Sequence, residues 1–187
     1  MTPSARPRGK ISIIPRGLAL GVTFSAPDSD RFNYSREELV AKIKVALGGR
    51  SAEEVVFGDL TTGAESDFQQ LTQIARHMVG RWGMNDTIGT VTVIPQDGQG
   101  PFLPGASGVS EETQRIIDEE VRKLVAQARG EVLTLLQANR DKLDALVNEL
   151  LEHETLDQLD AYAAVGIDPP AAVVDGPLAA AATTAAT

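Results

Sequence analysis

Residues 35–57, SREELVAKIKVALGGRSAEEVVF, decide the fold of this chain. Ser35 and Glu38 have the spacing of a capping box, in which each side chain binds an otherwise unpaired amide of the first helical turn. Leu39, Ile43 and Leu47 then recur at helical spacing and form one apolar stripe. The pattern predicts an amphipathic helix that begins after Ser35 and buries one face.

Two adjacent glycines, Gly48 and Gly49, interrupt this pattern. Each glycine weakens a helix by about 1 kcal/mol relative to alanine. The composition nevertheless stays helical from Arg50 to Phe57. We therefore expect either a break in the helix at the two glycines or the close approach of another backbone.

Three further segments have the periodicity of amphipathic helices. One begins near Asp67 and ends at Gly83, and another begins after its cap Ser110. The last follows Asn139, which is expected to end the preceding helix and to cap the new one. The last two helices predict a C-terminal helical hairpin. The fold class expected is mainly α, a helical body with a small β element near the N-terminus.

Extended structure is expected in two places. Residues 10–24 place isoleucines before the turn at Pro15-Arg16-Gly17 and then alternate large and small side chains up to Phe24, the period of a half-buried strand. Residues 88–94 form a second, shorter run of this kind.

The two ends differ in composition from the body between them. Residues 1–9 are a basic N-terminal arm, and residues 10–166 hold the apolar periodicity of a domain. Residues 167–187 are rich in Pro, Ala and Thr and carry too little large apolar surface to offset their ordering entropy, so this tail is predicted to be disordered.

Composition and charge exclude several function classes. The chain has 187 residues, enough for one ordinary domain, and no cysteine, which excludes disulfides, a thiolate nucleophile and Cys-ligated metals. The net charge of -9 argues against nucleic acid as the main partner, because phosphate binding needs a basic face. In the Gly-Lys pair at Gly9-Lys10, Ile11 follows where a P-loop needs Ser or Thr, so no ATP site is expected. No membrane segment or signal peptide is apparent, which favours the cytoplasm.

The two histidines are weak candidates for a metal site. His153-Glu154-Thr155-Leu156-Asp157 resembles the His-Glu-x-x-His pattern of zinc hydrolases but has Asp in place of the second His. Thr155 and Gln158 have capping-box spacing, so we expect a helix to end near His153 and another to start at Thr155. His77 lies ten residues, or ~15 Å along the predicted helix, after Asp67, so these two side chains cannot share one metal, and His77 is expected at the surface or an edge.

Asp67 is the remaining candidate. It follows the loop Thr61-Thr62-Gly63-Ala64-Glu65-Ser66 and falls in the first turn of a predicted helix. By spacing alone, a carboxylate at this place is a helix-start charge that the helix dipole stabilises.

Seven short segments, in this order, resemble the peptidase domain of FtsH-type ATP-dependent zinc metalloproteases. They are residues 13–17 (IIPRG), 34–39 (YSREEL), 47–54 (LGGRSAEE), 62–67 (TGAESD), 75–84 (ARHMVGRWGM), 110–121 (SEETQRIIDEEV) and 139–143 (NRDKL). The resemblance covers residues 10 to about 160 and is specific because the order of all seven is kept.

The resemblance implies a mostly helical zinc peptidase domain that assembles into a hexameric ring under an ATPase ring and degrades protein substrates. It implies that Asp67 is the third zinc ligand and that Glu53 lies near the metal site, beside the ligands rather than among them. The strand from Leu18 to Phe24 is implied to lie beside the extended substrate. Full-length members of the family are membrane-anchored, with this domain in the cytoplasm.

The chain also departs from the family pattern. The His-Glu-x-x-His helix, which carries two zinc ligands and the catalytic Glu, is expected just upstream of residues 13–17 and is not present, and neither is the ATPase domain. The domain is therefore expected to be incomplete at its N-terminal side, doubtful as a zinc binder by itself and inactive alone. Three hypotheses remain open: a C-terminal portion of a protease, a non-catalytic module that joins or modulates rings of full-length protease, or a remnant with no function of its own.

Overall fold

A computed structural model of the chain describes residues 8–15, 21–25, 33–59, 61–94 and 109–169. Most of the predicted basic arm, most of the predicted tail and the start of the predicted strand at Leu18 lie outside these residues. Arg8 and Gly9 of the predicted arm belong to a strand. No helix among the described residues is long and apolar enough to cross a bilayer.

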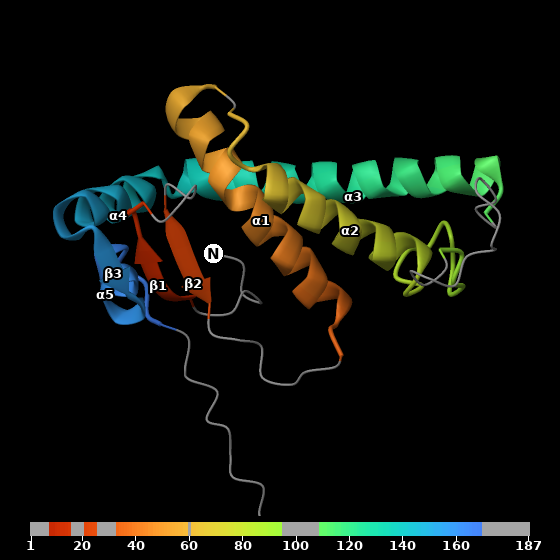
Figure 1. The fold of residues 1–187 in the computed structure, drawn as a ribbon, viewed down its shortest axis with the longest axis horizontal. Coiled ribbons are helices and arrows are strands. Elements are labelled where there is room, and N and C mark those ends of the chain that lie inside the picture. The colour runs from red at the N-terminus through yellow and green to blue at the C-terminus, as the bar shows by residue number, and fades with distance from the viewer. Residues whose placement is uncertain (1–7, 16–20, 26–32, 60, 95–108, 170–187) are drawn as a thin grey trace, which may run out of the picture.

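Three helices form the body of the molecule: α1 (Arg36–Phe57), α2 (Glu65–Gly80) and α3 (Glu111–Ala138). Figure 1 shows α1 and α2 lying across the long α3. The apolar stripes of all three helices meet in one core, so the helical periodicity of the sequence is used as predicted. Its most deeply buried side chains are Ile43, Leu47, Leu71, Met78, Val79 and Ile117.

The predicted capping box at the start of α1 is confirmed. The Ser35 hydroxyl accepts a hydrogen bond from the Glu38 amide at 3.2 Å, and the Glu38 carboxylate accepts one from the Ser35 amide at 2.8 Å. The break expected at Gly48 and Gly49 is wrong, because α1 continues through both to Phe57. The alternative expectation is a second backbone packed against the glycines. No described residue fills this role, since none lies within 4 Å of a Cβ built on either glycine.

A small antiparallel sheet packs at one end of the helical body (Figure 1). Its strands are β1 (Arg8–Ser12), β2 (Val22–Ser25) and β3 (Thr155–Asp157), in the order β2-β1-β3. Ile11 pairs with Thr23 on one side and with Leu156 on the other. The N-terminal β element is therefore confirmed, and its central strand also pairs with a segment near the other end of the chain.

The third strand corrects the prediction at Thr155. Thr155 does not cap a helix: it lies in β3, and its hydroxyl shares a hydrogen bond of 2.8 Å with that of Ser12. Asp157 caps the short helix α5 (Gln158–Ala164) instead, accepting a hydrogen bond from the Asp160 amide at 2.9 Å. The helix does end at His153, as predicted, and Glu154 follows with a φ of 56°.

The two predicted C-terminal helices are consecutive and meet at Asn139. α4 (Arg140–His153) follows α3 after that single residue and leads toward the sheet (Figure 1). Asn139 is the junction but does not cap α4 with its side chain, since its side-chain Nδ2 donates to the Leu135 carbonyl of α3. At this corner the Arg140 guanidinium donates to the Val55 carbonyl of α1. This bond joins the sheet-bearing end of the molecule to the three-helix body.

The β-like run predicted at residues 88–94 is wrong, because the segment has no strand partner among the described residues. Its last part closes over the end of α2, where the Gly80 carbonyl accepts hydrogen bonds from the amides of Val93 and Ile94. The alternation of apolar residues therefore reflects packing of a loop against the helical core.

Candidate metal-ligand site at the start of α2

Asp67 lies in the first turn of α2, as the sequence predicts, and is exposed. Its carboxylate makes no hydrogen bond or ion pair with a described residue. Ala64, at the N-cap position, has no hydroxyl or carboxylate to bind the free amides of the first turn. The partial positive charge of these amides favours an acid at this place. The carboxylate of Asp67 is thus accessible and has no bond to a described residue.

The loop before Asp67 is held by the last turns of α1. Glu53 accepts a hydrogen bond of 3.0 Å from the Thr61 hydroxyl, and the same hydroxyl accepts one of 3.3 Å from the Gly63 amide. Arg50 donates to the Thr61 carbonyl at 2.7 Å. Two side chains one helical turn apart therefore hold one residue of the loop.

Arg50 also reaches the far side of Asp67. Its guanidinium carbon lies 5.1 Å from the centre of the Phe68 ring, within the range of a cation–π contact. Sequence reasoning singled out Glu53 but neither Arg50 nor Thr61. Arg50 stands in the segment 47–54, and Thr61 directly precedes the segment 62–67, so their closeness in sequence is the only signal that local patterns offer.

Neither histidine belongs to a group of three possible metal ligands among the described residues. His153 is exposed at the C-terminal end of α4, 3.4 Å from the Glu149 carboxylate, and Asp157 belongs to the next helix start. His77 lies inside α2 and packs edge-on against the ring of Trp82, with 5.2 Å between centroids. The interpretation of both as structural residues agrees with these positions.

No group of three His, Cys, Asp or Glu side chains suited to a metal occurs within the described part of the chain. A catalytic zinc needs three protein ligands and an open position for water. Asp67 fits one such ligand, because its carboxylate is exposed and no described residue bonds to it. The residues described here do not fit a complete zinc site by themselves.

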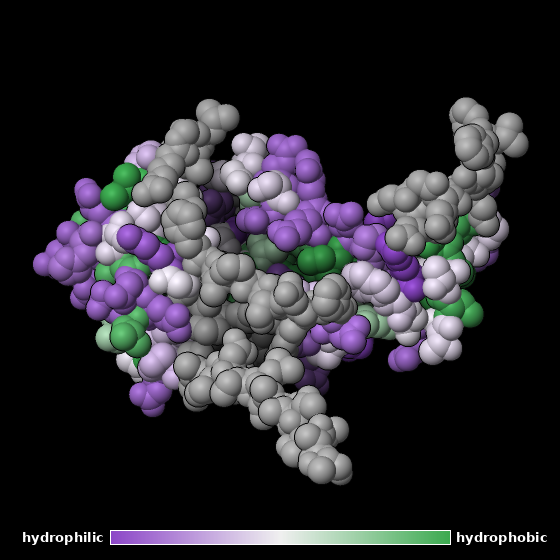
Figure 2. All heavy atoms as spheres, turned by 60° about the horizontal axis from the view of Figure 1, so that its bottom comes forward, coloured by the Kyte–Doolittle hydropathy of each residue, from purple (hydrophilic) through white to green (hydrophobic). Residues whose placement is uncertain are grey.

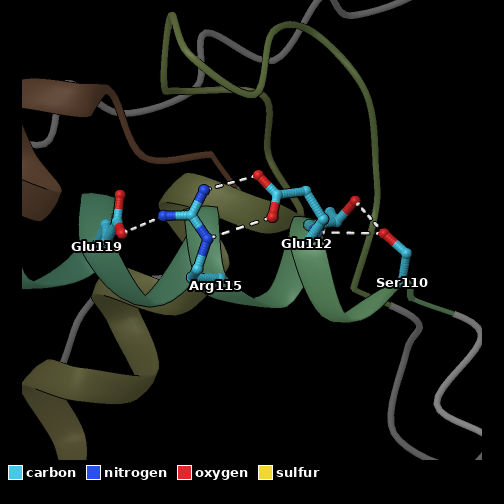
Figure 3. Close-up of polar contacts among 5 residues, drawn as sticks. Ser110, Glu112, Arg115 and Glu119 are labelled. Atoms are coloured by element: carbon cyan, nitrogen blue, oxygen red, sulfur yellow. Dashed lines mark hydrogen bonds and ion pairs between the residues drawn. The ribbon is translucent and has the colours of Figure 1, made fainter.

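A hollow lies on α3, near Ser110, and Asp67 does not line it. Its volume is about 390 Å³, and it is lined by Val109, Glu111, Gln114, Arg115, Asp118, Glu119 and Arg122. Figure 3 shows Arg115 lying between Glu112 and Glu119 on the same helix, with hydrogen bonds to both. The hydrogen bonds from Arg115 lower the pKa of Glu112. Arg115, which lines this hollow, is thus paired with two acids of its own helix.

Comparison with known proteins places the chain in a family. The model of peptidase family M41 matches residues 1–163. The chain belongs to peptidase family M41. Among curated M41-like relatives, the ATP-dependent zinc metalloprotease FtsH 3 of Conexibacter woesei is 62% identical over 168 residues, which are 90% of this chain and 22% of the relative.

Two other relatives show the same coverage. The ATP-dependent zinc metalloprotease FtsH of Thermobaculum terrenum is 46% identical over 172 residues, 89% of this chain and 26% of that protein. FtsH 4 of Sphaerobacter thermophilus is 43% identical over 183 residues, 93% of this chain and 28% of that protein. The chain thus spans about a quarter of the length of the M41 proteases that it matches, and the resemblance predicted from the seven segments is confirmed.

Proposed function

We propose that this chain is the C-terminal portion of an ATP-dependent zinc metalloendopeptidase and supplies Asp67 as the third zinc ligand. The observation that carries the proposal is the exposed carboxylate of Asp67, which has no bond to a described residue and lies in a family-matched segment that α1 holds in place. Zinc with a full ligand set would polarise a peptide carbonyl and lower the pKa of a bound water. The two remaining ligands and the catalytic Glu would come from another segment.

The residues of this chain have three roles in the proposal. Asp67 binds the metal through a carboxylate oxygen, and Glu53 stays beside the site because its own carboxylate is engaged by the Thr61 hydroxyl. The antiparallel strands β1 and β2 lie in the same domain and supply the expected surface for an extended protein substrate. The assembly proposed is an oligomeric ring, located in the cytoplasm.

A chimeric protease tests this function. The matched region of the Conexibacter woesei protease is replaced by the corresponding residues of this chain, and zinc content and ATP-dependent casein hydrolysis are measured. We expect an active chimera in which Asp67→Ala and Asp67→Asn lower hydrolysis by about 100-fold, because a metal ligand is lost. His153→Ala should leave both readouts unchanged.

The matched control is Asp141→Asn, which removes an exposed carboxylate of α4 that has no bond to a described residue. It should retain full hydrolysis. An active chimera that is insensitive to Asp67→Ala would contradict the proposed ligand role. The isolated chain should hydrolyse no casein with added zinc, and a chimera that assembles but stays inactive would favour the alternative of a non-catalytic assembly module.

A further inference from the structure

Arg50 contacts the candidate site from both sides of Asp67. Its guanidinium donates to the Thr61 carbonyl at 2.7 Å, six residues before Asp67, and lies over the ring of Phe68, the residue directly after it. The planar guanidinium can make both contacts at once, with an N–H in its edge and the ring against its face. Arg50 therefore bridges the whole turn that carries the candidate ligand.

The turn has a second connection to the same face of α1. Glu53 lies three residues after Arg50 and accepts the hydrogen bond of the Thr61 hydroxyl. Thr61 in turn accepts a hydrogen bond from the Gly63 amide. We refer to Arg50, Glu53, Thr61 and Phe68 as the Arg50 cluster.

The start of α2 depends on this cluster because it lacks a cap of its own. Ala64 makes no side-chain hydrogen bond to the first turn, whereas Ser35 and Ser110 cap α1 and α3. An uncapped first turn frays unless tertiary contacts hold it. Asp67 is exposed and has no bond of its own to a described residue, so its position follows from that of the backbone around it.

We infer that Arg50 is a positioning residue, which fixes the place of the Asp67 carboxylate by holding Thr61 and Phe68 on either side of it. Thr61 is held twice by α1: its carbonyl accepts the hydrogen bond of Arg50, and its hydroxyl donates one to Glu53. The consequence for catalysis rests on the proposed function, whereas the consequence for the backbone of residues 61–68 does not.

Hydrogen exchange of the full 187-residue chain tests the backbone effect. We expect Arg50→Ala and Thr61→Val to speed exchange of the hydrogen-bonded amides of this stretch, those of Gly63, Glu65 and Phe68, about tenfold, because charge-assisted and hydroxyl hydrogen bonds are lost. Thr61→Ser keeps the hydroxyl and should restore slow exchange. The control is Arg129→Ala, which removes the Arg129–Glu54 ion pair at the same end of α1 but no contact of the Arg50 cluster.

The chimera tests the catalytic effect. Arg50→Ala should lower kcat by about 10- to 100-fold with KM within about twofold, the size expected when a partner of a metal ligand is removed. The visible spectrum of the cobalt-substituted chimera should shift, since the geometry of one ligand changes. Arg50→Lys keeps the charge but loses the planar contact, and should fall between Arg50→Ala and the unchanged chimera.

Two results would overturn the inference: unchanged exchange at residues 63–68, or exchange that rises equally throughout the chain and marks a general loss of stability. An unchanged kcat and cobalt spectrum with locally faster exchange would overturn the link to Asp67. An inactive unmutated chimera would instead overturn the proposed function, and the exchange experiment on the isolated chain would still decide the role of Arg50.

Discussion

Cγ1 of Ile94 lies 2.6 Å from the position that a Cβ atom would take on Gly80. Real Cβ atoms do not approach other carbons so closely, so a side chain at residue 80 would force the Ile94 side chain to move. The backbone of the same glycine holds the loop, since its carbonyl accepts hydrogen bonds of 2.8 and 2.9 Å from the Val93 and Ile94 amides. Gly80 is thus the point where the segment after α2 packs onto the core.

The first prediction follows from this contact. Gly80→Ala should lower the free energy of unfolding by about 1–3 kcal/mol, the usual cost of overpacking, even though alanine favours a helix. Urea denaturation followed by circular dichroism measures the change. In a chain that already carries Ile94→Ala the same substitution should cost less, and additive effects of the two changes would contradict the steric explanation.

The second prediction concerns the glycines inside helices. Gly49→Ala should raise the free energy of unfolding of the isolated chain by about 0.5–1 kcal/mol, because the residue is exposed in mid-helix and no described atom lies within 4 Å of the new Cβ. Gly130→Ala in α3 is the matched control, since it is equally exposed and open. Destabilisation at Gly49 alone would mean that a backbone outside the described residues lies against α1.

The sequence predicts the helices better than it predicts their connections. Periodicity and caps near each helix locate α1, α2, α3 and α4, because an amphipathic helix is encoded within a few turns. The pairing of Ile11 with Leu156 in the sheet is not visible in either segment, since it joins residues far apart in the chain. The spacing of Thr155 and Gln158 predicts a helix cap, because a local pattern cannot reveal that the Thr155 hydroxyl bonds to Ser12.

The same limit applies to the candidate site. Asp67 and Glu53 could be found by resemblance to the family, because each stands in a recognisable short segment. The contact of Arg50 with both Thr61 and Phe68 depends on how α1 packs beside the start of α2, which no local pattern states. Residues that bind a ligand are therefore easier to predict from sequence than residues that hold them in place.

The third prediction is a pH dependence at Glu120. Hydrogen bonds from Lys123 and then from Asn85 lower the pKa of this carboxyl below its ordinary value of 4.5. Asn85 also accepts hydrogen bonds from the Thr87 and Ile88 amides, so Glu120 fixes the loop after α2 to α3. A carboxyl whose pKa is lower in the folded state contributes stability that is present above its unfolded pKa and is lost as the pH falls through its folded pKa.

Glu120→Gln should therefore lower the free energy of unfolding by about 1 kcal/mol at pH 7, and the difference from the unchanged chain should shrink as the pH falls below 4.5. Thermal melts between pH 7 and pH 3 measure this. The control is Glu152→Gln on α4, where the carboxylate is exposed and has no bond to a described residue. A difference at Glu120 that stays constant across this range would show that the carboxylate charge plays no part.

The last prediction separates the two readings of the segment after His153. If Asp157 caps α5, Asp157→Ala should lower the free energy of unfolding by about 1 kcal/mol, whereas Asp157→Asn should cost little because asparagine is an equally good cap. Urea denaturation measures both, and amide exchange at Asp160 should rise in the alanine variant alone. The control is Thr155→Ser, which keeps the hydroxyl that meets Ser12 and should match the unchanged chain. The opposite result, faster exchange of the Asp160 amide in Thr155→Val but not in Asp157→Ala, would show that Thr155 is the cap. His153 ends α4 and Asp157 starts α5, with a left-handed residue and a strand between them, so the near match to His-Glu-x-x-His does not lie on one helix face.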